Sequence, residues 1–383
     1  MKLNKRVLFI TGSHTLSGSE IANINVAEVL KNYGANIYYL VTPWSENKIG
    51  KYIRSKNIQT ISYRIKTKVY DWRYVFQSFF LTFLDSYYLL KIIRKYGITS
   101  IHISSEHYVR IFIIYFAFSG KEIIYRMGDA PNIHRALFRW IWKKILFGKV
   151  KLFVCVSQYI SDKIKSLGCP DDKIRIIYSY PFSRSTGNSF SRAKDEKESN
   201  TIISYAGQIS RHKGVDVLVE AALLLCQINT KVIFRIAGDI QYNPDLYQEL
   251  KNQIENSGLM ERIQFVGFID DIFQYFSNSD IHICPSVFED PMPNVIFEAK
   301  SAGIPTVGFR SGGIPELIDH QSDGYLCDNK NADSLLKGIN FFMNKENLAK
   351  AKISARQSLD SLGVNQKHFE DQWVAVYEQE NEK

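Results

Sequence analysis

The sequence predicts an α/β protein built from two doubly wound domains, each with a parallel sheet covered by helices on both faces. Short apolar runs rich in β-branched and aromatic residues alternate with helical patterns along the whole chain, which is typical of parallel sheets. The chain has 383 residues, too many for one ordinary domain. A polar segment at residues 183–200 interrupts the alternation near the middle, as a linker or exposed loop does.

The front half contains seven predicted strands separated by helical patterns. The strands are expected at residues 7–11, 36–42, 58–63, 100–104, 122–126, 152–157 and 174–178. The clearest helices are expected at residues 18–33, 72–95 and 133–147. We therefore assign residues 1–182 to a first Rossmann-like domain and residues 183–200 to a linker.

The back half repeats the pattern. Strands are expected at residues 201–205, 231–236, 263–266, 280–284 and 305–309, and helices at residues 215–228, 245–257 and 293–302. We assign residues 201–363 to a second Rossmann-like domain. This architecture alone does not name a function, because many activities share it.

Cysteine and hydropathy patterns exclude several protein classes. The number of cysteines is odd and no Cys-x-x-Cys pair occurs, which argues against a disulfide framework or a zinc site. The longest apolar stretch, residues 111–118, is far shorter than the roughly 20 residues of a membrane span. The apolar run at residues 7–10 is too short for a signal peptide. We expect a cytoplasmic protein without a membrane-crossing helix.

Charge is divided unevenly along the chain. Residues 1–198 carry 32 Lys and Arg against 14 Asp and Glu, whereas residues 199–383 carry 16 against 25. The basic front half suggests an anionic partner. Within it, Arg135, Arg139 and Lys143 recur every four residues beside Trp140 and Trp142, a pattern that suits a helix on an anionic membrane surface. It equally suits a helix that packs on the sheet with its charged face in water.

The strongest local pattern lies in the back half, where two adjacent carboxylates, Glu289 and Asp290, separate a predicted strand from a predicted helix that carries Glu298. Parallel-sheet proteins bind ligands at this end of a strand. The backbone N–H groups expected to bind an anion at the start of the helix are those of Met292, Asn294 and Val295. The alternative is an acidic loop that only caps the helix.

Two further strand-to-helix connections carry candidate ligand-binding groups. The loop after the strand at 201–205 contains Gln208, Arg211 and Lys213, and a lysine there is suited to neutralise a diphosphate leaving group. The turn after the strand at 305–309 contains Gly312 and Gly313, whose backbone is suited to cradle a phosphate. Each pattern alone is equally typical of a solvated loop or an ordinary turn.

Together, in this order on one sheet, the three connections resemble the donor domain of retaining glycosyltransferases of family 4. That family shows a G-R/Q-L-x-x-x-K-G loop, here Gly207 to Gly214, a P-S-x-x-E-x7-E-A block, here Pro285 to Ala299, and a G-G-x-x-E turn, here Gly312 to Glu316. The resemblance covers roughly residues 200–330 well and the rest by architecture. It implies the GT-B fold, in which two Rossmann-like domains face each other across a cleft. It also implies that residues 364–383 form a helix crossing back to the first domain.

The resemblance implies roles for individual residues. Lys213 and Asp290 are the expected catalytic residues: Lys213 contacts the donor phosphates, and Asp290 holds the donor sugar, with Glu289 as the alternative. Glu298 is expected to accept hydrogen bonds from the ribose. The other residues implied at the site are Gly18 at the donor phosphates, Val266 and Gly267 at the base, and Gly128 and Asp129 on the acceptor side.

Three departures from the family pattern stand out. Position 290 is Asp where the family has Glu, so its reach is one methylene shorter. Position 208 is Gln where Arg is common, and we expect Arg211 to supply the missing charge. Gly128 replaces a frequent histidine, which leaves the acceptor side undefined.

The function implied is transfer of a sugar from a UDP- or GDP-sugar, with retention, to a glycan or lipid-linked glycan in cell-surface polysaccharide synthesis. No metal or other cofactor is expected, because Lys213 and helix N-termini supply the positive charge. The expected partners are the nucleotide sugar, the acceptor and an anionic membrane surface at the inner face of the cell membrane. The alternatives are an epimerase or phosphorylase of the same fold, or a nucleic-acid-binding protein, although no nucleic-acid-binding module is recognisable.

Overall fold

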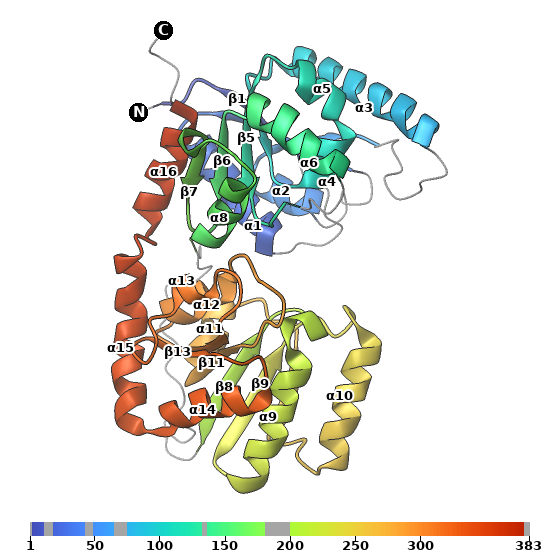
Figure 1. Cartoon of the computed structure of the whole chain (residues 1–383). Helices are drawn as coiled ribbons and strands as arrows, with labels where there is room; N and C mark the ends of the chain where they lie inside the picture. The colour runs from blue at the N-terminus through green and yellow to red at the C-terminus, as the bar shows by residue number, and fades with distance from the viewer. Residues whose placement is uncertain are drawn as a thin grey trace. The chain divides into compact units, whose positions relative to one another are not determined.

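The computed structural model describes residues 2–10, 18–42, 49–64, 75–131, 136–180 and 200–378. The chain forms two compact units: unit 1 is Met1–Ser179 with Gln366–Lys383, and unit 2 is Tyr180–Asn365. Figure 1 labels the elements of both. The predicted linker lies outside the described residues except for Asn200, so its ends stay predictions.

Unit 1 is built on a seven-stranded sheet in the order β3-β2-β1-β4-β5-β6-β7, and every neighbouring pair is parallel. The strands are β1 (Arg6–Ile10), β2 (Asn36–Val41), β3 (Gln59–Ser62), β4 (Ser100–Ile103), β5 (Glu122–Met127), β6 (Leu152–Cys155) and β7 (Ile174–Ile176). The helices are α1 (Gly18–Asn32), α2 (Lys51–Ser55), α3 (Val75–Tyr96), α4 (Glu106–Ile111), α5 (Ile113–Phe118), α6 (Ala136–Ile141), α7 (Phe147–Lys149), α8 (Gln158–Ser166) and α16 (Gln366–Glu378). All seven predicted strands are present.

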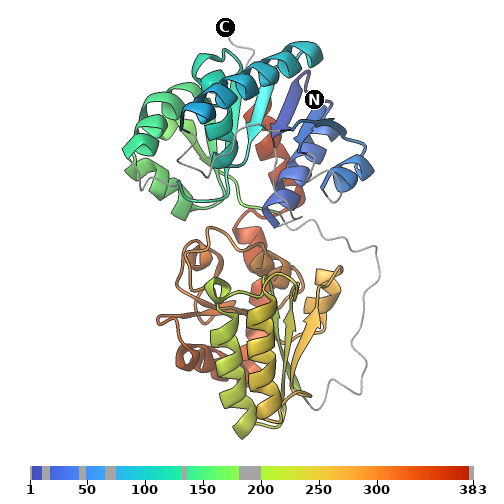
Figure 2. The same cartoon turned by 90° about the vertical axis from the view of Figure 1, so that its right-hand side faces the viewer.

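The two faces of this sheet bury different helices, because side chains alternate across each strand. On one face Phe9 stacks on His102, with ring centroids 4.2 Å apart, and α16 covers them. The Tyr377 hydroxyl of α16 lies 2.8 Å from His102 Nδ1. On the other face Trp142 stacks on Tyr125 at 5.8 Å. Figure 2 shows α3 and α16 on opposite sides of the sheet.

The helix predicted at residues 133–147 is not one regular helix. After α6 the chain forms a π-helix, η3 (Trp142–Leu146), whose i→i+5 bonds change the side-chain spacing. Residues two apart lie on nearly opposite sides of a helix, and here Trp142 is buried while Trp140 is exposed. Trp142 therefore packs on the sheet, and only Trp140 is left beside the exposed cations. Arg135 lies outside the described residues.

Unit 2 is built on a six-stranded parallel sheet in the order β10-β9-β8-β11-β12-β13. The strands are β8 (Thr201–Ala206), β9 (Val232–Ala237), β10 (Ile263–Gly267), β11 (Ile281–Cys284), β12 (Thr306–Phe309) and β13 (Gly324–Cys327). The helices are α9 (Val215–Ile228), α10 (Pro244–Asn256), α11 (Ile272–Ser277), α12 (Asn294–Ser301), α13 (Ile314–Leu317), α14 (Ala332–Met343) and α15 (Lys345–Ser361). Strand β13 was not predicted.

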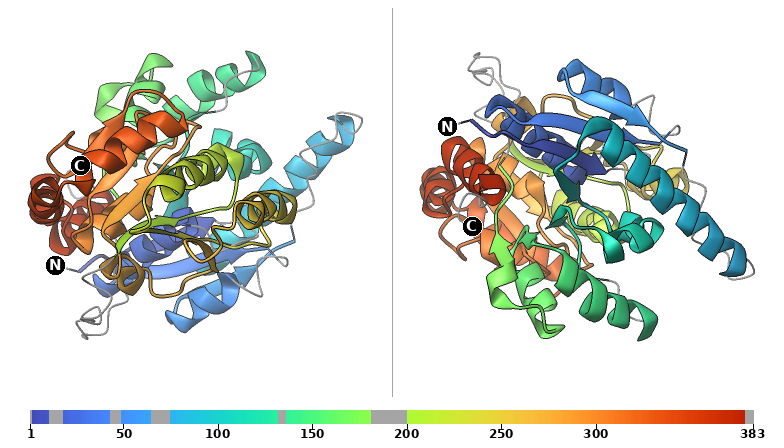
Figure 3. Two further views of the ribbon diagram at one scale, coloured as in Figure 1. Left: turned by 90° about the horizontal axis from the view of Figure 1, so that it is seen from below. Right: turned by 90° about the horizontal axis from the view of Figure 1, so that it is seen from above.

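Helices cover both faces of this sheet as well. Helices α9 and α14 pack together on one face, and α11, α12 and α15 pack together on the other, an arrangement that Figure 3 shows from below. The core between α9, α14 and the sheet contains Leu218, Phe234, Ile283 and Phe342, all fully buried. The α/β prediction with two parallel sheets is therefore confirmed.

All five cysteines are free and buried. They are Cys155, Cys169, Cys226, Cys284 and Cys327. Cys155 and Cys284 are buried strand residues, in β6 and β11. Within the ranges that the structure describes, no helix is long and apolar enough to span a bilayer.

Candidate active site

Three loops meet at the carboxyl edge of the unit 2 sheet. They follow the neighbouring strands β8, β11 and β12, and they contain residues 207–214, 285–293 and 310–313. Strand β8 is the switch point of the sheet, because the next strand in sequence, β9, pairs on one side of it and β11 on the other. Open α/β sheets bind their ligands at such a point.

Backbone hydrogen bonds tie the three loops together. The N–H groups of Val287 and Phe288 both donate to the His212 carbonyl, at 3.0 and 3.1 Å. The Gly313 N–H donates to the Asp290 carbonyl at 2.8 Å. The Ser311 hydroxyl donates to the Phe288 carbonyl at 2.6 Å. The middle loop is therefore held from both sides.

Two glycines make this close approach possible. Gly214 has a φ of +72°, and a Cβ there would lie 1.9 Å from the Pro285 carbonyl oxygen. Gly312 has a φ of +56°, and a Cβ there would lie 2.0 Å from the Asp290 carbonyl oxygen. Glycine adopts this left-handed conformation at little cost, and any side chain would push the loops apart.

Lys213 and Asp290 meet where the loops converge. Lys213 Nζ lies 2.5 Å from Asp290 Oδ2 and 4.8 Å from the centroid of the Phe288 ring. The Asp290 residue is only 5% exposed, whereas Glu289 is exposed. The structure thus brings the two expected catalytic residues into contact. It also favours Asp290 over Glu289 as the carboxylate of this site.

Helix α12 begins directly after the middle loop. Its N-cap is Pro293, which provides no side-chain hydrogen bond to the helix. Met292 is buried, and Asn294 and Val295 are half-buried at the first turn. Unpaired N–H groups at a helix start attract anions, so this end of α12 is suited to a phosphate.

Glu298 lies on the second turn of α12. Burial raises the pKa of its carboxyl from 4.5 to about 7, because desolvation disfavours the charged form. Its side chain accepts no hydrogen bond from any residue that the structure describes. A half-buried carboxylate with unused acceptor capacity is suited to bind hydroxyl groups of a ligand.

Arg211 and Gln208 do not join the Lys213–Asp290 contact. The Arg211 guanidinium pairs with Glu249 at 2.7 Å and with Asp216 at 3.1 Å, and it is exposed. Gln208 is half-buried, and its backbone carbonyl accepts a hydrogen bond from the Tyr205 hydroxyl at 2.8 Å. Their roles in donor binding stay predictions.

Val266 and Gly267 lie on β10, two strands away from β8. Val266 is the extra residue of a β-bulge, and Gly267 has a φ of +75°. The Gly267 carbonyl accepts a hydrogen bond from the Gly238 N–H. A Cβ on Gly238 would lie 2.2 Å from the Gly207 carbonyl oxygen, so this position also needs glycine. A row of glycines thus links this position to the loop after β8.

In unit 1 the predicted residues also gather at the carboxyl edge of the sheet. Gly18 begins α1 and is exposed, and residues 11–17 before it lie outside the described residues. A Cβ on Gly128, the residue after β5, would lie 3.3 Å from Ser19 Oγ. Gly18 and Gly128 therefore belong to one neighbourhood, with Asp129 exposed beside them.

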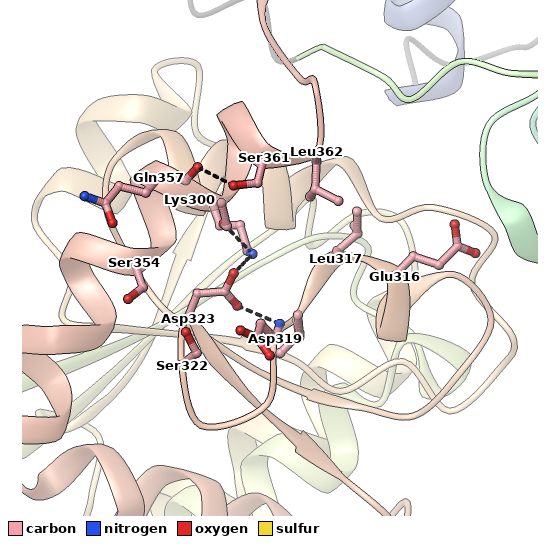
Figure 4. A pocket seen from close by; sticks show the side chains of 12 residues that line it. Lys300, Glu316, Leu317, Asp319, Ser322, Asp323, Ser354, Gln357, Ser361 and Leu362 are labelled. Atoms are coloured by element: carbon pink, nitrogen blue, oxygen red, sulfur yellow. Dashed lines mark hydrogen bonds and ion pairs between the residues drawn. The ribbon is translucent and has the colours of Figure 1, made fainter.

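Sequence reasoning missed a buried ion pair of unit 2 at the amino end of β13. Lys300 and Asp323 are almost completely buried and bonded to each other, and Lys300 also donates to Ser358 Oγ at 2.9 Å. They line a polar cavity of about 380 Å³ between α12, α15 and the loop before β13, where Figure 4 shows the two side chains pointing at each other. The available signal was slight: Lys300 follows Ala299 within the predicted helix at residues 293–302.

No metal site stands out among the residues that the structure describes, since none of their His, Cys, Asp and Glu side chains form groups of three or more able to hold an ion. The expectation of a metal-independent site stays a prediction.

Two family models match the chain. The model described as glycosyl transferases group 1 matches residues 188–358, and the model described as glycosyltransferase family 4 matches residues 16–179.

Curated relatives match at low identity. An uncharacterized glycosyltransferase of Haemophilus influenzae is 22% identical over 98% of this chain and 100% of its own length. A Campylobacter jejuni protein named N,N'-diacetylbacillosaminyl-diphospho-undecaprenol alpha-1,3-N-acetylgalactosaminyltransferase is 23% identical over 82% of this chain and 86% of its own. The match to an uncharacterized glycosyltransferase of Methanocaldococcus jannaschii, 27% identical, spans 49% of each chain.

Solved structures match over nearly the whole chain. A glycosyltransferase from Rickettsia africae has a TM-score of 0.83 at 20% identity and covers 99% of this chain and 100% of its own. Anabaena HepE, solved in complex with UDP-glucose, has a TM-score of 0.78 at 19% identity and covers 97% of this chain and 99% of its own. The GT-B fold is thereby established, and the nucleic-acid-binding, epimerase and phosphorylase alternatives are not favoured. By its sequence in both units and by its fold, this chain belongs to the group 1 glycosyltransferases of family 4.

Proposed function

We propose that this glycosyltransferase transfers a hexose from a UDP-sugar, with retention of configuration, to a glycan or lipid-linked glycan during synthesis of a cell-surface polysaccharide such as capsule or lipopolysaccharide. The observation that carries the proposal is the contact between Lys213 and Asp290 beside the start of α12 and Glu298. The Lys213 cation and the start of α12 suit the phosphates of such a donor. The carboxylates of Asp290 and Glu298 suit hydroxyl groups of its sugar and ribose.

The choice of UDP and of a lipid-linked acceptor has support from relatives. HepE was solved with UDP-glucose, and the Campylobacter relative is named for a diphospho-undecaprenol acceptor. Both match this chain at low identity, so they support the class of substrate rather than its details.

Lys213 is proposed to exchange partners when the donor binds. Without ligand its ammonium group pairs with Asp290. A donor diphosphate carries more negative charge than one carboxylate and attracts the same cation. As the bond between the anomeric carbon and the diphosphate breaks, charge on the leaving group grows, and Lys213 stabilises it. The acceptor oxygen bonds to the anomeric carbon on the same face, and its proton passes to the leaving diphosphate.

A thermal-shift panel of UDP-, GDP- and ADP-hexoses tests the donor, because a ligand that binds the native state raises the melting temperature. We expect UDP-hexoses to give the largest shift and Glu298→Gln to reduce it. A panel without any shift contradicts the proposal. Proton NMR of the product's anomeric signal then tests retention, and an inverted product would overturn that part.

The acceptor side is proposed to contact anionic lipid through unit 1. Large aromatic side chains stay exposed on α3, α5 and α6, namely Phe80, Phe83, Tyr87, Phe118 and Trp140. Exposed cations lie on the same helical segments, namely Lys91, Arg139 and Lys143. We call these eight residues the aromatic–basic surface. Aromatic residues beside cations suit the boundary of an anionic membrane.

A further inference from the structure

Arg126 on β5 is a buried cation whose hydrogen-bonding capacity is largely unused. The residue is 5% exposed. Its Nη2 donates to Ser179 Oγ at a long 3.4 Å, and its Nη1 is buried without a partner among the residues that the structure describes. A guanidinium carries five N–H donors, and a buried charge without partners is strongly destabilising. Arg126 therefore lowers the stability of the fold in the absence of a ligand.

A second buried polar side chain with unused hydrogen-bonding capacity lies on α1, the helix that carries Ser19. Asn23 on α1 is 1% exposed, and within the described part of the chain neither atom of its amide has a hydrogen-bond partner. It lies one helical turn from Glu20, so both project from the same face of α1. Burial lowers the pKa of Arg126 to about 10, although the carboxylates of Glu20 and Asp129 act in the opposite direction. Arg126 remains a cation at neutral pH.

The cluster reaches the surface at Gly128. A Cβ on Gly128 would lie 3.6 Å from Arg126 Nη1 and 3.3 Å from Ser19 Oγ. Gly128 is half-buried and Ser19 is exposed, so the guanidinium lies just beneath the carboxyl end of β5. Parallel sheets bind ligands at this end of their strands.

We propose that Arg126, with Asn23 and Ser19, forms a subsite of unit 1 that binds a phosphate oxygen of a substrate. Guanidinium groups match phosphate oxygens through two parallel hydrogen bonds. This inference rests on the proposed function, in which the donor is a nucleoside diphosphate sugar and a lipid-linked acceptor carries a diphosphate as well. Both substrates carry a diphosphate, so the phosphate oxygen bound by Arg126 comes from either the donor or the acceptor.

Calorimetry on the full chain separates these sources with two probes, UDP for the donor and farnesyl diphosphate for the acceptor. We expect Arg126→Met to weaken binding of one probe by on the order of 10- to 100-fold, and Arg126→Lys to weaken the same probe less. Gly128→Ala narrows the space above Nη1 and should weaken that probe too. Arg6→Met, at the opposite edge of the same sheet, is the matched control and should change neither.

Melting temperatures distinguish a binding role from a structural one. Because Arg126→Met removes a poorly paired buried charge, its melting temperature should equal or exceed that of the wild type. Loss of UDP binding assigns the subsite to the donor, and loss of farnesyl diphosphate binding assigns it to the acceptor. Unchanged binding of both probes to folded Arg126→Met overturns the inference, and if that variant does not fold, unchanged binding to Gly128→Ala does. So does a wild type that binds neither probe. If farnesyl diphosphate binding depends on Arg126 but no nucleotide sugar binds, only the proposed donor fails.

Discussion

Unit 2 pairs the charges at the carboxyl edge of its sheet with one another, whereas unit 1 leaves charge at the same edge with few partners. At that edge of unit 2, Lys213 contacts Asp290, and a second pair, Lys300 with Asp323, is buried at the amino edge where β13 begins. In unit 1, the Arg126 guanidinium makes one long hydrogen bond within the described part of the chain. The imbalance extends to the whole chain, since residues 1–198 carry 32 Lys and Arg against 14 Asp and Glu, and residues 199–383 carry 16 against 25.

The difference separates a preformed site from an incomplete one. Paired charges hold the unit 2 loops in place before any ligand arrives, which is the arrangement expected where a small donor is recognised. Excess positive charge in unit 1 destabilises that unit unless an anionic partner neutralises it. We expect one charge pair of unit 2 to serve stability and the other turnover, and the cations of unit 1 to serve binding.

The largest expected effect lies in the stability of unit 2. Lys300→Ala leaves Asp323 buried without its cation, which should lower the free energy of unfolding by about 3–5 kcal/mol. The double change Lys300→Met with Asp323→Leu should recover most of the loss, because an apolar pair of similar volume replaces a buried ion pair well. Urea unfolding of the full chain measures both. Lys350→Ala, which breaks the exposed pair with Glu346, is the control. If Lys300→Ala loses no more unfolding free energy than Lys350→Ala, water reaches the pair of Lys300 and Asp323.

Next in size is turnover at the donor site. Lys213→Ala should lower kcat by on the order of 10²-fold while changing donor KM less, because charge on the diphosphate grows toward the transition state. Arg211, two residues away, pairs outward with Glu249 and Asp216, so Arg211→Ala should lower kcat much less than Lys213→Ala does. Steady-state kinetics with the donor found by thermal shift compares the two. An equal loss of kcat in both variants would show that Arg211, despite its pairing with Glu249 and Asp216, acts on the donor as Lys213 does.

A smaller effect is expected for donor affinity at Glu298. Glu298→Gln should weaken UDP binding by about 1.5–3 kcal/mol, because charge-assisted hydrogen bonds to hydroxyl groups are lost. Calorimetry measures the affinity, and the melting temperature of the ligand-free variant should not fall. Unchanged affinity in a folded variant would assign Glu298 to the structure of α12 alone.

The pKa of Glu298 adds a pH dependence with a definite sign. Its pKa of about 7 is raised above 4.5 by burial, so the folded protein binds more protons than the unfolded chain between these values. Its contribution to stability therefore falls as pH rises from about 4.5 to 7. Hydroxyl groups that donate to the carboxylate favour its ionised form, so UDP should bind more tightly at pH 8 than at pH 6, with proton release. Glu298→Gln should abolish this difference, and a difference that persists would place the titrating group elsewhere.

The limits of sequence-based prediction follow from the same comparison. Apolar runs predicted all seven strands of unit 1 and five of six in unit 2, because buried parallel strands need them. Strand β13 escaped because its four residues begin with a glycine and include a half-buried tyrosine. The donor loops were recognisable because their key residues lie within short segments. Lys300 and Asp323 pair across 23 residues, and Ser19 meets Gly128 through tertiary packing, so neither contact leaves a local signal.

The smallest expected effect is reversible docking of the aromatic–basic surface on anionic lipid. Phe118 is 86% exposed and Phe80 is 61% exposed, and the one acidic side chain of α3, Asp85, is buried and bonded to Tyr63. Each cation near an anionic surface contributes about 1 kcal/mol, so a few suffice for weak binding. The attraction should fade as added salt shortens the Debye length from about 10 Å at 0.1 M to about 3 Å at 1 M.

Co-sedimentation of the full chain with phosphatidylglycerol vesicles at both salt concentrations measures this docking. Arg139→Glu with Lys143→Glu should reduce the sedimented fraction at low salt. Lys350→Glu with Lys367→Glu, two exposed lysines on α15 and α16, makes the same change of charge outside that surface. If the two double variants lose vesicle binding equally, net charge alone drives it and the aromatic side chains have no part. If only the first loses it, the exposed aromatic residues and their neighbouring cations form one surface, and unit 1 meets its acceptor at the membrane.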